Sequence, residues 1–208
     1  MRQTPDTILV VSLEATCWET PLEQPPKQHN EVIELAWLPL SFQKLTTGNP
    51  VSFFVKPPTS KVSEFCTRIT GVKQAQVDKG FSLIDACQKL VNAGSQKLPW
   101  ASFGDFDRFI FKHQCNTNKV PYPFQIGHWD FATTFAKMMG LEHEVKLPIA
   151  LKLMGLDFIG ERHNSRDEVN NIAALMVETF RRVRGNYATT KITTDRTTEE
   201  PGTKETEE

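Results

Sequence analysis

Ile8-Leu-Val-Val-Ser-Leu-Glu-Ala-Thr-Cys-Trp18 is the stretch that decides the fold, because it joins a continuous apolar run to a carboxylate. Residues 8 to 13 are typical of a strand that is buried on both faces of a sheet. Glu14 follows at a point where its side chain would still be half-buried, and an ionised carboxylate there needs hydrogen bonds, a charged partner or a cation. A bound metal would meet that need, and an ordinary salt bridge would meet it equally well.

The chain around this stretch alternates between strand and helix patterns. Four further strands are predicted, at residues 31–40, 52–56, 99–103 and 124–128. Helices are predicted at residues 62–69, 82–92, 105–115, 131–139, 148–154 and 167–184. Three meandering strands followed by strands that alternate with helices predict an α/β fold. We expect a mixed five-stranded sheet, with three antiparallel strands and then parallel strands, flanked by helices.

Composition is that of an ordinary soluble domain. The chain has 208 residues, a formal net charge of -1 and 39% hydrophobic residues, which excludes a collagen-like or wholly disordered protein. One domain is predicted over residues 1–187, followed by a disordered, acidic, threonine-rich tail over residues 188–208. No apolar run is long enough to cross a membrane, and the first residues lack the layout of a secretory signal. We therefore expect an intracellular, cytoplasmic protein, or a nuclear one if its source is eukaryotic, without a membrane partner.

Two further segments carry groups that suit catalysis. Phe103-Gly-Asp-Phe-Asp-Arg-Phe109 places Asp107 in the first turn of a predicted helix, and Gly160-Glu-Arg-His-Asn-Ser-Arg-Asp-Glu-Val-Asn-Asn-Ile-Ala173 places His163 five residues before Glu168. Together with Glu14, these motifs resemble the DEDDh 3′–5′ exonucleases of the ribonuclease H-like superfamily. The resemblance covers residues 7–184 and is strongest to the Eri-1/KapD-like exoribonuclease branch, which trims small RNAs and the ends of histone messenger or ribosomal RNA.

The resemblance implies a ribonuclease H-like fold and a role for each motif residue. Glu14, Asp107 and Glu168 would hold up to two divalent cations, Mg²⁺ or Mn²⁺, which favour oxygen ligands. His163 would be the general base that takes a proton from the attacking water, with Glu14 as the other catalytic residue. The terminal nucleotide would be bound by residues beside the first and second motifs, namely Ala15, Thr16, Trp18 and Phe106.

Two positions depart from the family motif. Ser12 stands where the family has the aspartate that touches both metals, so one negative charge is missing and one of the two ions is expected to be weak or absent. Ser12 would be a weak ligand or would hold a metal-bound water. Glu168 stands where the family has its last aspartate, and Asp167 precedes it. Neighbouring helix positions point about 100° apart, so Asp167 replaces Glu168 only if the local backbone shifts.

We therefore expect a metal-dependent 3′–5′ exonuclease that hydrolyses terminal phosphodiesters and releases nucleoside 5′-monophosphates. The expected substrates are RNA 3′ ends, single-stranded or in a short overhang, with DNA as an alternative. Ser12 favours a rival interpretation, in which a catalytically weakened or inactive exonuclease fold binds RNA ends or a protein partner. A third alternative is a scaffold whose acidic tail is a docking segment.

Overall fold

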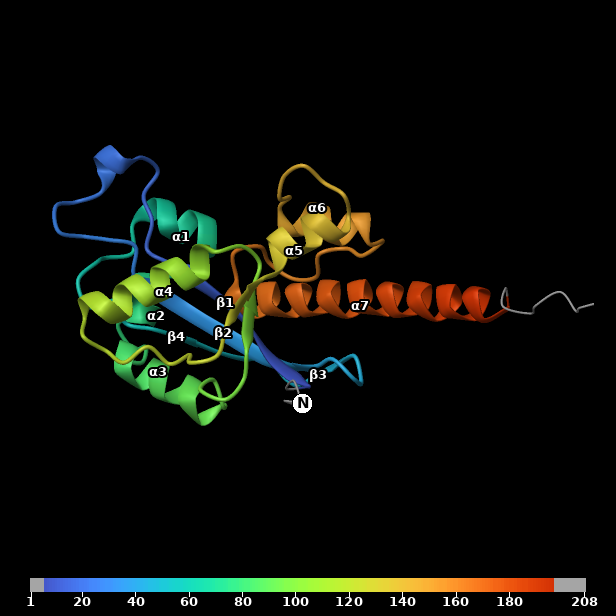
Figure 1. The fold of residues 1–208 in the computed structure, drawn as a ribbon. Coiled ribbons are helices and arrows are strands. Elements are labelled where there is room, and N and C mark those ends of the chain that lie inside the picture. Colours follow the sequence, from blue (N-terminus) through green and yellow to red (C-terminus); the bar gives the residue numbers. More distant parts are fainter. Residues whose placement is uncertain (1–5, 197–208) are drawn as a thin grey trace, which may run out of the picture.

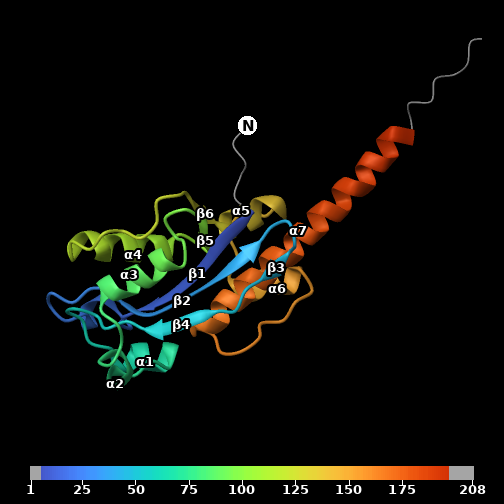
Figure 2. The same cartoon turned by 90° about the horizontal axis from the view of Figure 1, so that it is seen from below.

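One mixed β-sheet forms the centre of the molecule (Figures 1 and 2). The computed structural model describes residues 6–196, with side chains through residue 185. The strands are β1 (Thr7–Ala15), β2 (Val32–Ser41), β3 (Thr46–Thr47), β4 (Val51–Phe54), β5 (Trp100–Ser102) and β6 (His128–Asp130). Their order is β3-β2-β1-β5-β6, and β4 also pairs with β2. β2 is antiparallel to β1, β3 and β4, whereas β1, β5 and β6 are mutually parallel.

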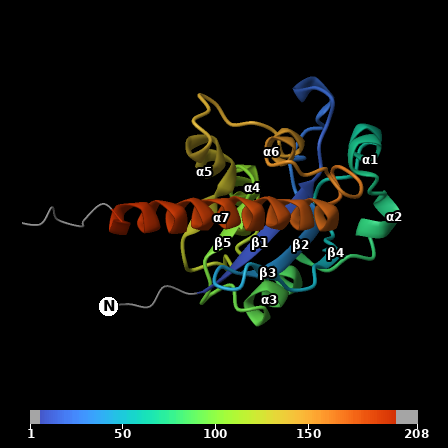
Figure 3. The same cartoon turned by 90° about the vertical axis from the view of Figure 1, so that its right-hand side faces the viewer.

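Helices cover both faces of this sheet. They are α1 (Glu64–Thr70), α2 (Gln74–Val77), α3 (Leu83–Asn92), α4 (Phe106–Thr117), α5 (Phe131–Met138), α6 (Leu147–Leu153) and α7 (Ser165–Arg196), with one 3-10 turn, η1 (Pro21–Glu23). Figure 3 shows α7 lying across one face of the sheet, while α3 and α4 lie on the opposite face. The expected α/β architecture with a mixed, helix-flanked sheet is confirmed.

β1 shows why its sequence is apolar without alternation. Ile8 and Val10 pack into a core cluster with residues of α5, α6 and α7. Leu9, Val11 and Leu13 pack into a second cluster with residues of α3 and α4. Successive side chains of a strand point to opposite faces, so a strand with a core on each side needs apolar residues at every position. Ser12 and Glu14 are therefore exceptions on the face that α7 covers.

Two expectations about the strands are corrected. The sheet has six strands rather than five, because the two-residue β3 pairs with the end of β2. The strand predicted at residues 124–128 instead runs from His128 to Asp130. Phe124, at the start of the predicted strand, lies outside β6. Its side chain is buried, and its ring stacks on that of Trp100 with centroids 4.3 Å apart.

The C-terminal helix is also longer than expected. Its backbone continues to Arg196, so residues 188–196 of the predicted disordered tail are helical. Residues 197–208 of that tail lie outside the described residues. Across residues 6–196, no helix combines the length and the apolar character needed to cross a membrane.

Candidate active site

The end of β1 places two polar side chains under α7. Ser12 and Glu14 follow Ile8 and Val10 on the same face of the sheet, because side chains repeat every two residues along a strand. Ser12 is only 4% exposed, and the side chain of Glu14 is 14% exposed. The carboxylate of Glu14 thus lies at the edge of the core, as the sequence predicts, rather than on the surface.

The segment that precedes α7 places His163 beside Glu14. His163 has a φ of 60°, an uncommon left-handed conformation for a residue other than glycine, and such conformations gather at functional sites. Its backbone N–H donates a hydrogen bond to Oε1 of Glu168, at 3.2 Å. Glu168 lies in the first turn of α7 and thereby fixes the turn that presents the imidazole.

Asp167 and Glu168 point to different partners. The carboxylate of Asp167 accepts a hydrogen bond from the backbone N–H of Glu161, at 2.8 Å, and packs against Gly160. A Cβ atom at Gly160 would lie 2.4 Å from Asp167, so this close approach requires glycine, whose φ there is +93°. Asp167 therefore closes the loop, and Glu168 is the carboxylate left to face the site.

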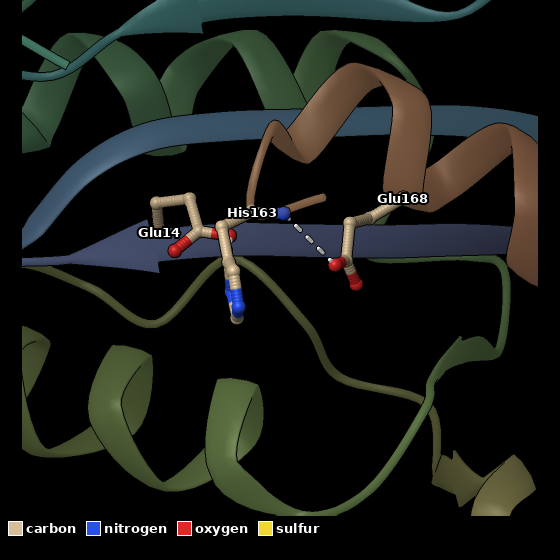
Figure 4. A group of neighbouring side chains, drawn as sticks. All are labelled: Glu14, His163 and Glu168. Atoms are coloured by element: carbon tan, nitrogen blue, oxygen red, sulfur yellow. Dashed lines mark hydrogen bonds and ion pairs between the residues drawn. The ribbon is translucent and has the colours of Figure 1, made fainter. Parts of the chain in front are cut away.

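Glu14, His163 and Glu168 converge from remote parts of the chain (Figure 4). One ligand atom of each lies within 4.8 Å of the others, a spacing that suits a shared cation. Nδ1 of His163 is 3.9 Å from Oε1 of Glu14, and the imidazole remains 42% exposed, so it can be reached by water. The sequence-based prediction that these two motifs meet is thus matched by the geometry.

Asp107 lies beside this group but is not a member of it. It is half-buried in the first turn of α4, where burial, followed by the charge of Glu168, holds the pKa of its carboxyl well above the ordinary range. Asp107 in turn raises the pKa of Glu14. Each motif therefore contributes a carboxylate to one electrostatically coupled cluster, made of Glu14, Asp107 and Glu168.

The charge of this cluster is not offset within the protein. Burial, followed by the charges of Glu168 and Asp107, raises the pKa of Glu14 to about 9. Among the side chains of residues 6–185, no lysine or arginine forms an ion pair with Glu14, Asp107 or Glu168. Neighbouring carboxylates without a counter-cation are an unfavourable arrangement unless a positive ligand binds among them.

The four predicted nucleotide-binding residues differ in how far they are exposed. Ala15 and Thr16 are buried, and the Thr16 hydroxyl donates to the His29 carbonyl at 2.7 Å while it accepts from the Glu31 N–H at 2.9 Å. The Thr16 side chain thus braces the loop, and its backbone is engaged as well, because its N–H donates to the Glu31 carbonyl at 2.8 Å and its carbonyl accepts from the Asn30 side chain at 2.6 Å. Trp18 is half-buried, whereas Phe106 is 57% exposed beside Asp107.

The sequence interpretation overlooked Glu34, which is part of this environment. Glu34 lies directly opposite Glu14 in the β1–β2 pairing and is 5% exposed. Its carboxylate accepts a hydrogen bond from the backbone N–H of Ser165, the first residue of α7, at 3.1 Å. Helix N-termini carry unpaired N–H groups and a partial positive charge, so Glu34 anchors α7 above Glu14. The available signal was a glutamate inside an otherwise apolar strand.

Comparison with known proteins accounts for this arrangement. The model of the Exonuclease family matches residues 9–176, which include all three motifs. The chain belongs to this family. The matched residues include Glu14, Asp107, His163 and Glu168.

Several exonucleases resemble this chain in sequence. The 3′–5′ exoribonuclease 1 of Rattus norvegicus is 28% identical over 186 residues, which cover 83% of this chain and 52% of the relative. The 3′–5′ exonuclease Snipper of Drosophila melanogaster is 26% identical, over 84% of this chain and 69% of the relative. The chain thus spans about half the length of the first of these relatives.

Solved structures resemble it as well. The nuclease domain of 3′hExo, described as a DEDDh family member bound to rAMP, is 26% identical with a TM-score of 0.75, over 85% of this chain and 92% of that one. The structure described as 3′-end specific recognition of histone mRNA stem-loop by 3′-exonuclease has a TM-score of 0.77 at 25% identity, over 86% of this chain and 84% of that one. The ribonuclease H-like fold is therefore confirmed.

The clustered residues of this chain fit the divalent cations that its family uses. Carboxylate oxygens are the ligands preferred by hard divalent ions, and the imidazole beside them also tolerates Mn²⁺. The raised pKa of Glu14, which the neighbouring carboxylates raise beyond the effect of burial, is the state expected of a ligand set without its cation. Ser12, buried on the same face as Glu14, has a neutral oxygen where a carboxylate would add a fourth negative charge to the cluster.

Proposed function

We propose that this protein is a metal-dependent 3′–5′ exoribonuclease, which hydrolyses terminal phosphodiesters of RNA and releases nucleoside 5′-monophosphates. The observation that carries the proposal is the convergence of Glu14, His163 and Glu168 within 4.8 Å in a member of the Exonuclease family. The proposed substrates are single-stranded RNA 3′ ends or short 3′ overhangs, because the relatives include 3′–5′ exoribonucleases. DNA is an alternative substrate.

Each residue has a proposed task. Glu14, Asp107 and Glu168 would hold Mg²⁺ or Mn²⁺, with Ser12 as a neutral contributor. When bound, such ions stabilise the negative charge that develops on the phosphate and on the leaving 3′ oxygen. The half-exposed imidazole of His163 accepts the proton of the attacking water, and Glu168 holds the His163 backbone so that the ring faces Glu14. The exposed ring of Phe106 and the half-buried Trp18 would contact the terminal nucleotide.

Replacement of His163 tests the proposal. Purified protein is incubated with 5′-labelled single-stranded RNA in Mg²⁺ or Mn²⁺, and we expect a ladder that shortens from the 3′ end. His163→Ala should lower kcat by about 100- to 10,000-fold, the usual contribution of a general base. His143→Ala is a matched control, because His143 is an exposed histidine outside the site. Equal degradation by wild type and His163→Ala would refute the assignment.

Ser12 favours a second candidate function. The neutral hydroxyl leaves the site with one carboxylate fewer than the family motif provides, so metal binding and hydrolysis would be weakened. In that case the protein would retain the fold and bind RNA ends, or a protein partner, without efficient cleavage. If the protein binds the labelled RNA but does not shorten it in either Mg²⁺ or Mn²⁺, this candidate is favoured over the first.

A further inference from the structure

The outer face of α4 presents three aromatic rings to solvent. Phe106 and Phe109 are 57% and 64% exposed, and His113 is exposed as well. The rings of Phe109 and His113 are stacked, with interplanar angle 10° and centroids 6.1 Å apart. Phenylalanine is usually buried in folded proteins, so two large exposed rings on one helix face make this surface a candidate for binding a flat ligand. We call Phe106, Phe109 and His113 the aromatic stripe.

The spacing of the stripe follows from helix geometry. Residues three and four apart lie on the same side of a helix, so positions 106, 109 and 113 form one row. Successive members of the row lie about 4.5 and 6 Å apart along the axis. Each ring can therefore accept a separate base of one extended strand.

The stripe begins at the candidate active site. Phe106 directly precedes Asp107, whose carboxyl interacts electrostatically with Glu168 and Glu14. The opposite side of α4 faces the core, where the side-chain carbonyl of Gln114 accepts the N–H of Val32 and orients the helix beside the end of β1. The row thus leads away from the acidic cluster without leaving α4.

The far end of the stripe meets the segment that supports the β1 end. His113 lines a small cavity together with Asn30, Glu31 and Thr117. Asn30 and Glu31 are in turn hydrogen-bonded to the backbone and side chain of Thr16, two residues after Glu14. The far end of the stripe therefore flanks the segment that holds the predicted nucleotide-binding residue Thr16 in place.

Charge favours a nucleic-acid occupant. Lys112 is exposed between Phe109 and His113 in sequence and can contact a phosphate, while flat rings stack on any base without a sequence requirement. Single-stranded RNA is recognised through such stacking of unpaired bases on aromatic side chains. A duplex would offer the stripe no free base faces.

We propose that Phe109 and His113 bind the unpaired bases upstream of the terminal nucleotide, so that the protein prefers single-stranded RNA ends long enough to reach both rings. This inference rests on the proposed exoribonuclease function and assigns its site a substrate length and strandedness. Phe106 would contact the terminal nucleotide, and the rings of Phe109 and His113 would contact the bases upstream of it.

The experiment compares a dinucleotide with a single-stranded RNA of about ten nucleotides, a length within the range of known single-strand binding sites. Affinity is measured by fluorescence anisotropy in Ca²⁺, and turnover is measured in Mg²⁺ or Mn²⁺. Phe109→Ala and His113→Ala should each reduce the advantage of the longer RNA over the dinucleotide by about 5- to 100-fold, the usual effect of losing one base-stacking ring. Phe109→Trp should restore most of it, and RNA should quench the new indole fluorescence.

Ile84→Ala is the matched control, because Ile84 is 57% exposed on α3 rather than on α4. It should keep the wild-type length preference. If Phe109→Ala also keeps that preference, the stripe does not bind the substrate and the inference is wrong.

The two proposals fail separately. If wild type binds the longer RNA but never cleaves it, the exoribonuclease function fails and the anisotropy measurement alone decides the stripe. If wild type cleaves RNA and Phe109→Ala does so with the same length preference, only the stripe inference fails. If wild type binds no RNA of either length, both are overturned.

Discussion

Glu14 on β1 and Glu34 on β2 are direct cross-strand neighbours, yet their carboxyl groups have different partners. Burial raises the pKa of Glu34, but its carboxylate accepts the Ser165 N–H at the start of α7, which acts in the opposite direction. Burial also raises the pKa of Glu14, and there the neighbouring charges of Glu168 and Asp107 raise it further. Buried carboxylates with a helix N-terminus as partner stabilise a fold, whereas those grouped with other carboxylates favour a cationic ligand.

The largest expected effect comes from adding a charge on the Glu14 side of this comparison. Ser12→Asp should tighten Mg²⁺ binding by about 10- to 100-fold, the range by which single groups around a metal change its affinity. The reason is that Ser12 is buried on the same face as Glu14, so a carboxylate there joins the acidic cluster. Isothermal titration with Mg²⁺ measures the change, and the dependence of RNA hydrolysis on Mg²⁺ concentration should shift in parallel.

Ser12→Asn is the control for this substitution, because asparagine has nearly the same size as aspartate but carries no charge. It should leave Mg²⁺ affinity near that of wild type. An Asp variant that binds Mg²⁺ no better than the Asn variant would show that position 12 is not what limits the site.

An effect of similar size is expected on the Glu34 side. Glu34→Ala removes the acceptor of a buried N–H at the start of α7, which should lower the free energy of unfolding by about 1–3 kcal/mol. Urea denaturation in EDTA measures this loss. Glu34→Gln keeps a carbonyl oxygen as acceptor and should lose less.

Glu14 provides the contrast in the same experiment. Glu14→Gln removes a group that the metal-free fold does not compensate, so the metal-free variant should be at least as stable as wild type while Mg²⁺ no longer stabilises it. Equal destabilisation by Glu14→Gln and Glu34→Ala in EDTA would break the distinction between the two glutamates.

The sequence predicted Glu14 and His163 better than it predicted Glu34 because the first two belong to local motifs. A carboxylate after an apolar strand and a histidine five residues before Glu168 are visible in short windows. The role of Glu34 depends on the β1–β2 register and on a contact with Ser165, which is 131 residues away. No local pattern reports a contact of that kind.

Element boundaries show the same limit. The sequence predicts a strand at residues 124–128, but the ring of Phe124 stacks on Trp100 and the strand begins only at His128. The choice between Asp167 and Glu168 likewise depended on Gly160, whose missing Cβ lets the Asp167 carboxylate close the loop. Tertiary packing, rather than local propensity, decided both cases.

A further expected effect is a pH dependence of stability that belongs to Glu14. Its pKa is about 9 in the folded protein and 4.5 ordinarily, so between these values the folded state holds a proton that the unfolded state has released. Stability therefore falls as pH rises across this window. The measurement is the Tm of wild type minus the Tm of Glu14→Gln, taken in EDTA at each pH from about 5 to 9. This difference separates the contribution of Glu14 from that of His128, whose pKa burial lowers.

The Tm of wild type should fall relative to that of the variant as pH rises. Saturating Mg²⁺ should abolish this dependence on pH, because it holds the Glu14 carboxylate ionised. A wild-type Tm that rises relative to Glu14→Gln toward alkaline pH would mean that a cationic group of the protein already compensates Glu14, and the contrast with Glu34 would not hold.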